Sequence, residues 1–383
     1  MHRVGHLIEQ VADMDNLRLA FYKAQKQKQE KQDVQVYREN LQENLLLLQR
    51  QILSGDIDIG NYHLFNIHDP KERVICAASF PERVLHHALM NVCLPRFEKN
   101  FISHTYANRV GKGVYAAIND ARKLIKSNRF VAKMDVRKYF DSINHKILKI
   151  QLRRLFKDKR LLDIFDQIID SYSVTDGCGL PIGNLTSQFF ANFYLSSLDH
   201  SVSLGYVRYM DDILLFANDR QTLLKEVHKL ELFASEQLKL SFKPPIIHTA
   251  DEYTDFLGYR LSHNRLTLNK RSRLRFKKKY NLYTSYFEDG SYYIGKFKDG
   301  KRDGYGKYFD KDNNLIYEGG FEKDVYEGYG QLALSDGFIY YGEFKNGHKY
   351  GNGIIVNKDG EVELEGKFSN MNDQSKESKR NKK

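Results

Sequence analysis

The chain has 383 residues, of which 41% are hydrophobic, and its 60 lysines and arginines exceed its 49 acidic residues to give a net charge of +11. This length allows two or three domains, and the hydrophobic content excludes a chain that is disordered throughout. The positive balance favours a polyanionic partner such as nucleic acid, or an anionic membrane surface. Three cysteines without CxxC spacing argue against a zinc site and predict reduced thiols in a cytoplasmic protein. We expect neither a signal peptide nor a transmembrane segment, because no long apolar run is present.

The N-terminal part is expected to be mainly helical. Apolar residues recur at helical spacing over 1–55, and a further helix is predicted over 81–100. The intervening segment, 56–80, is mixed and contains turn signals. His86 and His87 are adjacent on the second helical segment and therefore face different directions, which argues against a shared metal ion.

Two apolar runs in the middle of the chain contain aspartates. F-V-A-K-M-D-V, at 130–136, predicts a strand that ends near Asp135. V-R-Y-M-D-D-I-L-L-F, at 207–216, predicts a β-hairpin with Asp211 and Asp212 at its tip. Adjacent aspartates are also common in ordinary turns. If the two runs are neighbours in one sheet, however, three carboxylates converge at its edge and offer the oxygen ligands that Mg²⁺ prefers.

An internal repeat begins at about residue 290. Its anchor glycines are separated by 24, 23 and 24 residues, and they are Gly295, Gly319, Gly342 and Gly366. Each repeat has two β-like runs joined by a glycine-rich turn, which predicts one hairpin per repeat and a stack of such units.

Several motifs together resemble those of reverse transcriptases. In chain order they are R-V-L-H-H-A-L, S-H-T-Y-A-N-R-V-G-K-G-V, D-V-R-K-Y-F-D, G-L-P-I-G-N-L-T-S-Q-F-F-A-N-F-Y-L, Y-M-D-D and F-L-G-Y-R-L, within about residues 15–280. The S-Q pair after G-N-L-T resembles bacterial enzymes of the diversity-generating retroelement and defence-associated group, because group II intron enzymes tend to have S-P. The C-terminal pattern, Y-x-G-x-F-x-x-G-x-x-x-G-x-G, resembles the MORN repeat.

The resemblance implies an α+β fold, with right-hand polymerase fingers and palm, a truncated thumb and an all-β MORN-repeat array. The expected parts are N-terminal helices and fingers (1–130), a palm that includes a fingers insertion (131–260), a basic remnant thumb helix (261–289), MORN repeats (290–370) and a basic disordered tail (371–383). Only L-N-K-R-S-R-L-R-F-K-K-K-Y stands where the family has a full helical thumb, which puts long processive synthesis in doubt.

The resemblance also assigns catalytic roles. Asp135 and Asp211 would hold two Mg²⁺ ions, with Mn²⁺ as an alternative, and Asp212 and the Val136 carbonyl would complete the site. A primer 3′-hydroxyl then attacks the α-phosphate and pyrophosphate leaves. Asp141 is expected to be a structural partner.

Other residues are expected to contact the nucleotide. Phe140 resembles a steric gate against a ribose 2′-hydroxyl, although a core phenylalanine is the alternative. Ile182 stands where retroviral relatives have Gln, and an aliphatic residue there is typical of error-prone relatives. Lys243 lies where polymerases place a general acid. Cations of the finger-like motifs are expected to meet the triphosphate or the template, unless they are simply solvated: Arg73, Arg83, Arg109 and Lys112.

A basic segment after the last motif is expected to lie on a nucleic-acid backbone. Residues 265–279 hold eight basic residues and no acidic one, and a solvated charged helix is the alternative. The residues proposed to contact nucleic acid are Lys270, Arg271, Arg273, Arg275, Lys277 and Lys278.

The expected function is RNA-directed DNA polymerase, with an RNA template, deoxynucleotides and a DNA product as partners. The fused repeats and the short thumb favour antiphage defence over the alternative of an error-prone diversity-generating enzyme, and a structured non-coding RNA is a candidate partner. A non-catalytic RNA-binding or assembly scaffold is a third interpretation, although the presence of all three aspartates argues against it. The repeats are expected to mediate self-association or to bind a partner protein.

Overall fold

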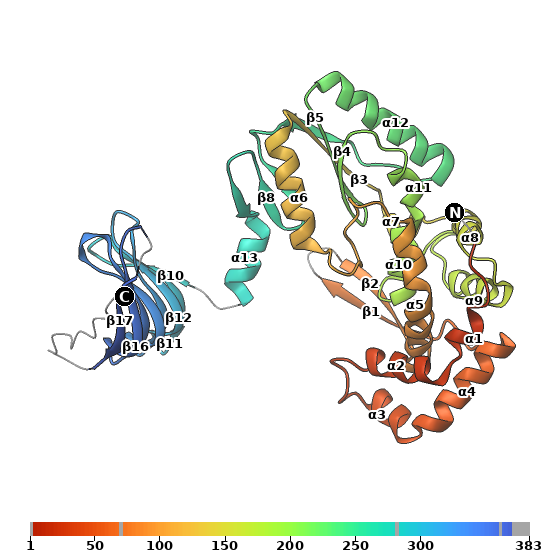
Figure 1. The fold of residues 1–383 in the computed structure, drawn as a ribbon, viewed down its shortest axis with the longest axis horizontal. Helices are drawn as coiled ribbons and strands as arrows, with labels where there is room; N and C mark the ends of the chain where they lie inside the picture. Colours follow the sequence, from red (N-terminus) through yellow and green to blue (C-terminus); the bar gives the residue numbers. More distant parts are fainter. Residues whose placement is uncertain (1–2, 69–71, 280–282, 360–361, 370–383) are drawn as a thin grey trace, which may run out of the picture. The chain divides into compact units, whose positions relative to one another are not determined.

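The computed structural model describes four stretches of the chain, 3–68, 72–279, 283–359 and 362–369 (Figure 1). It divides into two compact units, of which the first ends at Thr267 and the second begins at Leu268. None of the helices in these stretches combines the length and the apolar character that a membrane span requires. The tail predicted at 371–383 lies outside the described residues.

Helices dominate the N-terminal part, as the apolar spacing predicts. They are α1 (Ile8–Val11), α2 (Met14–Ala24), α3 (Gln32–Glu39), α4 (Leu41–Ser54) and α5 (Phe80–Asn100). The Asp13 carboxylate caps α2 by accepting hydrogen bonds from two amides of its first turn. Between α4 and α5, β1 (Tyr62–His68) and β2 (Glu72–Ala78) form an antiparallel hairpin. The mixed sequence of 56–80 does not predict these two strands.

The central sheet has four antiparallel strands in the order β4-β5-β3-β6. They are β3 (Phe130–Asp135), β4 (Gly205–Tyr209), β5 (Asp212–Ala217) and β6 (Ile246–Thr249). The hairpin predicted over 207–216 is confirmed, because β4 pairs with β5 and Tyr209 lies opposite Asp212. β3 also pairs with β5, so both apolar runs belong to one sheet.

Helices cover both faces of this sheet. Because successive side chains of a strand face opposite sides, Ala132 and Met134 enter one hydrophobic core and Val131 enters another. Figure 1 shows α6 (Val114–Ser127) and α12 (Arg220–Leu238) on opposite sides of the strands. The remaining helices of this unit are α7 (Tyr139–Ser142), α8 (His145–Leu155), α9 (Lys159–Asp170), α10 (Leu185–Tyr194) and α11 (Ser196–Asp199).

A small sheet and a basic helix follow the central sheet in the chain. The sheet has the strand order β7-β8-β9, with β7 (Thr254–Phe256), β8 (Tyr259–Leu261) and β9 (Leu266–Leu268). Leu257 and Gly258 turn the chain between β7 and β8 with positive φ angles. The helix predicted in the basic segment is α13 (Lys270–Lys279), and the Asn269 side chain caps it by accepting a hydrogen bond from the Ser272 amide.

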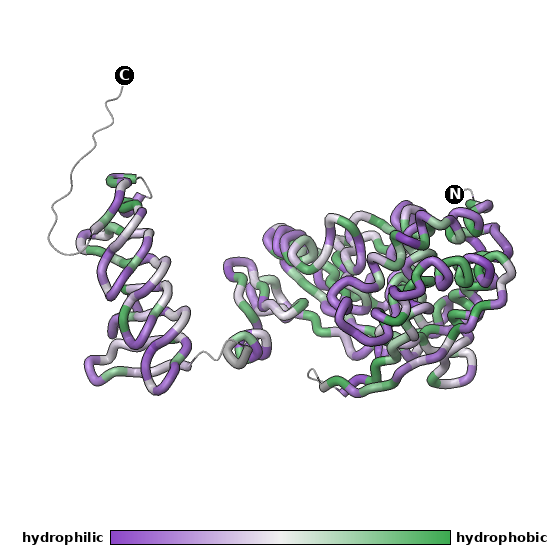
Figure 2. The backbone as a smooth tube through the Cα atoms, turned by 90° about the horizontal axis from the view of Figure 1, so that it is seen from below, coloured by the Kyte–Doolittle hydropathy of each residue, from purple (hydrophilic) through white to green (hydrophobic). Residues whose placement is uncertain are grey.

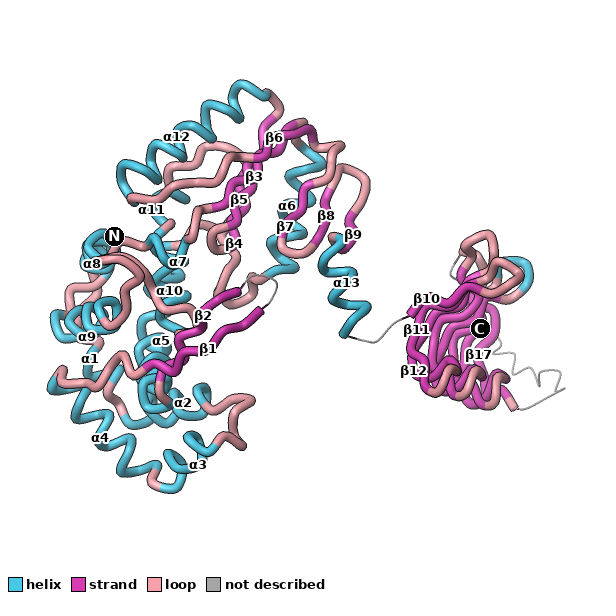
Figure 3. Tube along the Cα trace, turned by 180° about the vertical axis from the view of Figure 1, so that it is seen from behind, coloured by secondary structure: helices cyan, strands magenta, loops and turns pink. Residues whose placement is uncertain are grey.

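The second unit contains an antiparallel sheet whose strands follow one another in chain order (Figure 3). They are β10 (Tyr283–Tyr286), β11 (Tyr292–Lys298), β12 (Lys301–Phe309), β13 (Leu315–Glu322), β14 (Val325–Ala333), β15 (Ile339–Lys345), β16 (His348–Val356) and β17 (Val362–Phe368), with a short 3₁₀ turn, Ser335–Gly337, between β14 and β15. The prediction of one hairpin per repeat is confirmed. Hydrophobic and hydrophilic residues are interleaved along these strands (Figure 2).

A buried tyrosine explains the repeat period. Tyr293, Tyr317 and Tyr340 are fully buried, and each ring packs against glycines of two facing strands. A Cβ at Gly342 would lie 2.3 Å from the Tyr340 hydroxyl, and one at Gly353 would lie 2.5 Å from the same ring. The recurring glycines therefore supply the space that each tyrosine ring occupies.

Candidate active site

The β3–β5 pairing brings the three predicted aspartates to one end of the sheet. Asp135 is the last residue of β3 and lies directly opposite Asp212, the first residue of β5. Asp211 immediately precedes Asp212 in the turn from β4. That turn is closed by Met210, which has a φ of 57° in the left-handed region. The aspartates therefore converge because one strand pairing and one tight turn place them together.

The electrostatics of this site reflect crowded negative charge. Burial, followed by repulsion from Asp212 and Asp135, raises the pKa of Asp211 to about 6. Burial also raises the pKa of Asp212, and Asp135 adds to that effect while Lys133 opposes it. Perturbed carboxylates of this kind are typical of functional sites.

Two lysines lie among the carboxylates. Lys243 Nζ is 2.5 Å from an oxygen of Asp135, and Lys133 Nζ is 3.5 Å from an oxygen of Asp212. Lys133 also donates a hydrogen bond of 2.7 Å to the Asp255 carbonyl beside the β7–β8 turn. These ammonium groups offset part of the negative charge.

The backbone after β3 is fixed by a short bridge between Val136 and Phe242. Its hydrogen bonds run from the Lys243 amide to the Asp135 carbonyl and from the Arg137 amide to the Ser241 carbonyl. The Val136 carbonyl takes part in neither bond. The bridge therefore fixes Val136 next to the carboxylates. The expected role of its carbonyl as a metal ligand requires this position.

The donor set fits a hard divalent cation. In the described part of the chain, no group of three or more acidic, histidine or cysteine side chains is already arranged around a metal position. The chemistry of the site is nevertheless suitable, because Asp135, Asp211 and Asp212 supply carboxylate oxygens and the pKa values of the last two are raised. A bound Mg²⁺ would relieve the repulsion that raises them.

Two residues expected near the nucleotide lie on connected segments. The Phe140 carbonyl accepts a hydrogen bond from the Leu180 amide, and the Ile182 carbonyl accepts one from the Cys76 amide in β2. The segment around 180–182 therefore joins α7 to the β1–β2 hairpin. Phe140 is half-buried, and its ring packs edge-on against Tyr139.

The cations of the finger-like motifs differ in their surroundings. Arg109 is largely buried, and its guanidinium pairs with Glu98 and donates to the carbonyls of Ile102 and Thr105. These contacts give Arg109 a structural role in place of the expected phosphate contact. Lys112 donates to the Ser103 carbonyl and lies over the Tyr106 ring. Arg73 is exposed on β2.

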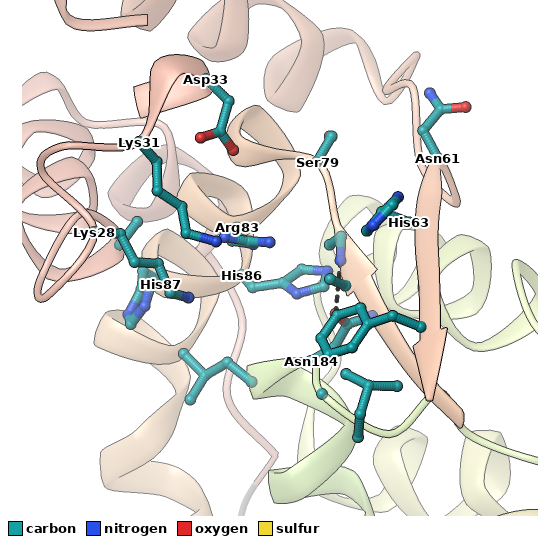
Figure 4. A pocket seen from close by; sticks show the side chains of 17 residues that line it. Lys28, Lys31, Asp33, Asn61, His63, Ser79, Arg83, His86, His87 and Asn184 are labelled. Atoms are coloured by element: carbon teal, nitrogen blue, oxygen red, sulfur yellow. Dashed lines mark hydrogen bonds between the residues drawn. The ribbon is translucent and has the colours of Figure 1, made fainter. Parts of the chain in front are cut away.

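Arg83 lines a largely basic pocket of about 570 Å³ that includes Asp33 but none of Asp135, Asp211 and Asp212 (Figure 4). The pocket lies between the segment after α2, the β1–β2 hairpin, α5 and the segment just before α10. Its lining contains three cations and three histidines: Lys28, Lys31, Arg83, His63, His86 and His87. Burial lowers the pKa of Lys28, Arg83 and Lys31 add to this effect, and Asp33 opposes it. Like charges in a partly buried pocket favour an anionic ligand.

Buried polar groups also line this pocket without a hydrogen-bond partner. They are Arg83 Nη1, His86 Nε2 and Asn184 Nδ2, although His86 Nε2 lies 3.4 Å from Glu82 in an ion pair. Sequence reasoning missed the pocket, apart from Arg83, because Lys28 and Lys31 belong to a stretch, K-A-Q-K-Q-K-Q-E-K-Q, that resembles an ordinary solvated surface.

Residues 68–261 match the family model for reverse transcriptase (RNA-dependent DNA polymerase), which spans all three aspartates. The chain belongs to the reverse transcriptase family. The family is one of RNA-directed DNA polymerases, which are nucleotidyltransferases. Three MORN repeats match at 293–315, 317–338 and 340–362. These matches confirm the predicted fold class, a polymerase-type α+β part followed by an all-β repeat array.

Known proteins similar to this reverse transcriptase include Protein YkfC of Escherichia coli K12, which is 23% identical over 278 residues, or 57% of this chain and 73% of YkfC. A putative COX1/OXI3 intron 1 protein of Saccharomyces cerevisiae is 22% identical over 171 residues, or 41% of this chain and 20% of that protein. Apo telomerase from Candida tropicalis is similar over 55% of this chain and 49% of its own, with 11% identity and a TM-score of 0.43. The chain thus spans about half the length of that telomerase.

The basic helix α13 belongs to the second unit of the reverse transcriptase. Lys270, Arg271, Arg273 and Arg275 lie on it, and Leu274 and Phe276 are 56% and 49% exposed. The side chains of Lys277 and Lys278 lie outside the described residues. Exposed apolar groups between cations suit contact with nucleic acid, where stacking and charge act together.

Proposed function

We propose that this reverse transcriptase copies an RNA template into DNA by adding deoxynucleotides to a primer 3′-hydroxyl. The observation that carries the proposal is the convergence of Asp135 and Asp212, at the ends of paired strands, with Asp211 in the tight turn beside them. Strand pairing holds Asp135 and Asp212 more rigidly than a loop would, as a site for phosphoryl transfer requires.

Asp135 and Asp211 are the residues proposed to hold two Mg²⁺ ions, or Mn²⁺ as an alternative, while Asp212 and the Val136 carbonyl complete the site. When bound, the ions lower the pKa of the attacking hydroxyl and offset the charge on the departing pyrophosphate. Lys243 is the proposed general acid for the pyrophosphate. Its ammonium contacts Asp135, which places it beside the proposed metal site.

Primer extension tests the proposed activity. The purified chain should extend a DNA primer on an RNA template only when deoxynucleotides and Mg²⁺ are present. The double variant Asp211→Ala with Asp212→Ala should be inactive. Absence of DNA synthesis on any RNA template, or full activity of the double variant, would refute the proposal.

Phe140 is the proposed gate against ribonucleotides. We expect Phe140→Ala to raise ribonucleotide incorporation relative to deoxynucleotide incorporation on the order of 10- to 100-fold, because the truncation frees space for a 2′-hydroxyl. The ratio of kcat/KM values for a matched pair of nucleotides measures this effect. Phe130→Ala, at the opposite end of β3, is the control and should leave the ratio unchanged. An unchanged ratio in Phe140→Ala would make Phe140 a packing residue only.

The basic pocket is proposed to contact the backbone of the RNA template. Lys28→Glu with Lys31→Glu should weaken single-stranded RNA binding roughly tenfold and reduce its salt dependence, because fewer counterions are released on binding. Fluorescence anisotropy across a salt series measures both quantities. Lys311→Glu with Lys358→Glu makes the same charge change in the repeat array and serves as the control. Equal effects of the two double variants would assign the binding to net charge and not to the pocket.

The proposed biological role is antiphage defence, as a retroelement-related enzyme that uses a structured non-coding RNA. The fused repeats and the short basic segment in place of a full thumb support this role. Phage plating on cells with the wild type or an Asp211→Asn variant tests it, with protection expected only from the wild type. A template repeat and variable repeat beside the gene would instead support the diversity-generating alternative.

The repeat array is proposed to mediate self-association or to bind a partner protein. Its regular exposed face carries Tyr305 and Tyr329, which are 54% and 71% exposed. The molar mass of the full chain, compared with a chain that ends at residue 289, tests self-association. A full chain that has its own monomeric mass would reject self-association and leave the partner-protein proposal.

A further inference from the structure

A fully buried arginine stands three residues before the aspartate pair. Arg208 lies in β4, and its side chain is 0% exposed. Its backbone pairs with the segment around Thr105, where the Arg208 amide donates to the His104 carbonyl. A buried guanidinium is stable only when its charge and its N–H groups are matched, so the partners of Arg208 reveal what it supports.

All five N–H donors of Arg208 have acceptors. Nε and one Nη2 proton bind the two oxygens of Asp199 at 2.6 and 2.5 Å. The other Nη2 proton binds the Asn192 carbonyl at 3.1 Å, and one Nη1 proton binds the Asn192 side-chain oxygen at 2.9 Å. Four of the five donors therefore connect β4 to α10 and α11.

The fifth donor reaches the catalytic turn itself. Arg208 Nη1 donates to the Met210 carbonyl at 2.9 Å. This carbonyl belongs to the peptide that joins Met210 to Asp211, and Met210 has a left-handed φ of 57°. A left-handed backbone at a residue other than glycine persists only where its surroundings hold it. Arg208 supplies such a restraint at the peptide immediately before Asp211.

We propose that Arg208 is a positioning residue for the polymerase reaction, which holds the Met210 carbonyl and thereby fixes the Asp211 carboxylate relative to Asp135. This inference rests on the proposed function, in which Asp211 acts as a metal ligand. Arg208 contacts neither substrate nor reacting atoms in this role. Asp199 and Asn192 orient the guanidinium, and Tyr206 supports Asp199 through a 2.7 Å hydrogen bond.

Two variants separate positioning from packing. Arg208→Lys keeps a positive charge for Asp199, but a single ammonium cannot also reach Asn192 and Met210. Arg208→Met with Asp199→Asn removes both charges, so no unpaired ion is left in the core and the fold is retained. Both variants should lower kcat about 10- to 100-fold, as a small misplacement of a reacting group does, with KM for deoxynucleotides changed less than about threefold.

Two further measurements do not depend on activity. Amide hydrogen exchange of the 205–216 segment should accelerate in both variants, and Mn²⁺ binding, followed by electron paramagnetic resonance, should weaken several-fold. The matched control is the Arg153–Asp166 pair between α8 and α9, which is also bidentate but partly exposed. Arg153→Met with Asp166→Asn should change none of these quantities.

The inference is overturned if folded Arg208→Lys and the Arg208→Met, Asp199→Asn double variant both keep wild-type kcat, exchange and Mn²⁺ binding. If the proposed function is wrong, the result is different. The wild type would then be inactive, but the variants would still differ from it in amide exchange and in Mn²⁺ binding. Should Arg208→Lys fail to fold, the double variant decides the question alone.

Discussion

Replacing Asp211 with asparagine is expected to abolish deoxynucleotide addition and, at the same time, to stabilise the metal-free protein. The loss of activity follows because a neutral amide cannot balance a divalent cation, and we expect a decrease of at least about 1,000-fold. The gain in stability follows because Asp211 is charged, largely buried and close to two other carboxylates. An ordinary structural aspartate would show the opposite change in stability.

The stabilisation of metal-free Asp211→Asn relative to the wild type should increase with pH. The pKa of Asp211 is raised from 3.8 to about 6 in the folded chain, so folding disfavours its ionised form. The resulting penalty is absent below about pH 4, grows as the pH rises through 6 and is complete above that value. The metal-free wild type should therefore lose stability relative to Asp211→Asn over this window, by on the order of 2 kcal/mol at pH 8.

Chemical denaturation with a chelator present, at pH 4.5 and pH 8, measures this difference. Asp163→Asn, an exposed position on α9, is the control and should change neither activity nor the pH profile. Destabilisation of Asp211→Asn at pH 8, or retention of more than about a tenth of wild-type activity, would contradict the account of the site.

Gly342→Ala is expected to disrupt the repeat array. The new Cβ would lie 2.3 Å from the Tyr340 hydroxyl and 2.7 Å from the Gly353 Cα, and the latter is backbone that cannot rotate away. Overpacking of this kind costs roughly 1–3 kcal/mol and occasionally more. The transition of the array in a thermal melt should move to lower temperature, and limited proteolysis within 283–368 should become faster.

Gly366 provides a matched control because it stands at the same position of the motif in β17. A Cβ there has nothing within 4 Å, and its φ is not in the left-handed region. Gly366→Ala should therefore be neutral or slightly stabilising, since alanine loses less backbone entropy than glycine. Similar melting of the two variants would show that the tyrosine–glycine packing does not determine the repeat.

Local patterns in the sequence predict much of the fold and the centre of the site. The apolar run that ends at Asp135 and the hairpin that presents Asp211 and Asp212 follow from residues close together in the chain. The repeat period likewise follows from a local requirement, the space for one buried tyrosine such as Tyr340. In each case the sequence pattern and the structural feature that it predicts lie within one or two strands.

Features that depend on distant partners could not be predicted in this way. Arg109 appears as a free cation in the motif, but Glu98 and two backbone carbonyls occupy its guanidinium. The role of Arg208 depends on Asp199 in α11, and R-Y-M-D-D alone does not indicate that the arginine is buried. The basic pocket joins Lys28 to Asn184 across more than a hundred residues. Tertiary packing brings such distant residues together, and the periodicity of the sequence does not predict that packing.

The carboxylates at the joined ends of β3 and the β4–β5 hairpin are proposed to direct DNA synthesis on RNA, and single-turnover primer extension is the decisive experiment. Wild type and Asp211→Asn would be mixed with a DNA primer on an RNA template of defined sequence, all four deoxynucleotides and Mg²⁺, after both proteins are shown to be folded. We expect the wild type to extend the primer by copying the template and to stop when Mg²⁺ is chelated, and we expect no extension by Asp211→Asn. Folded wild type that extends no primer, or equal extension by Asp211→Asn, would contradict this proposal.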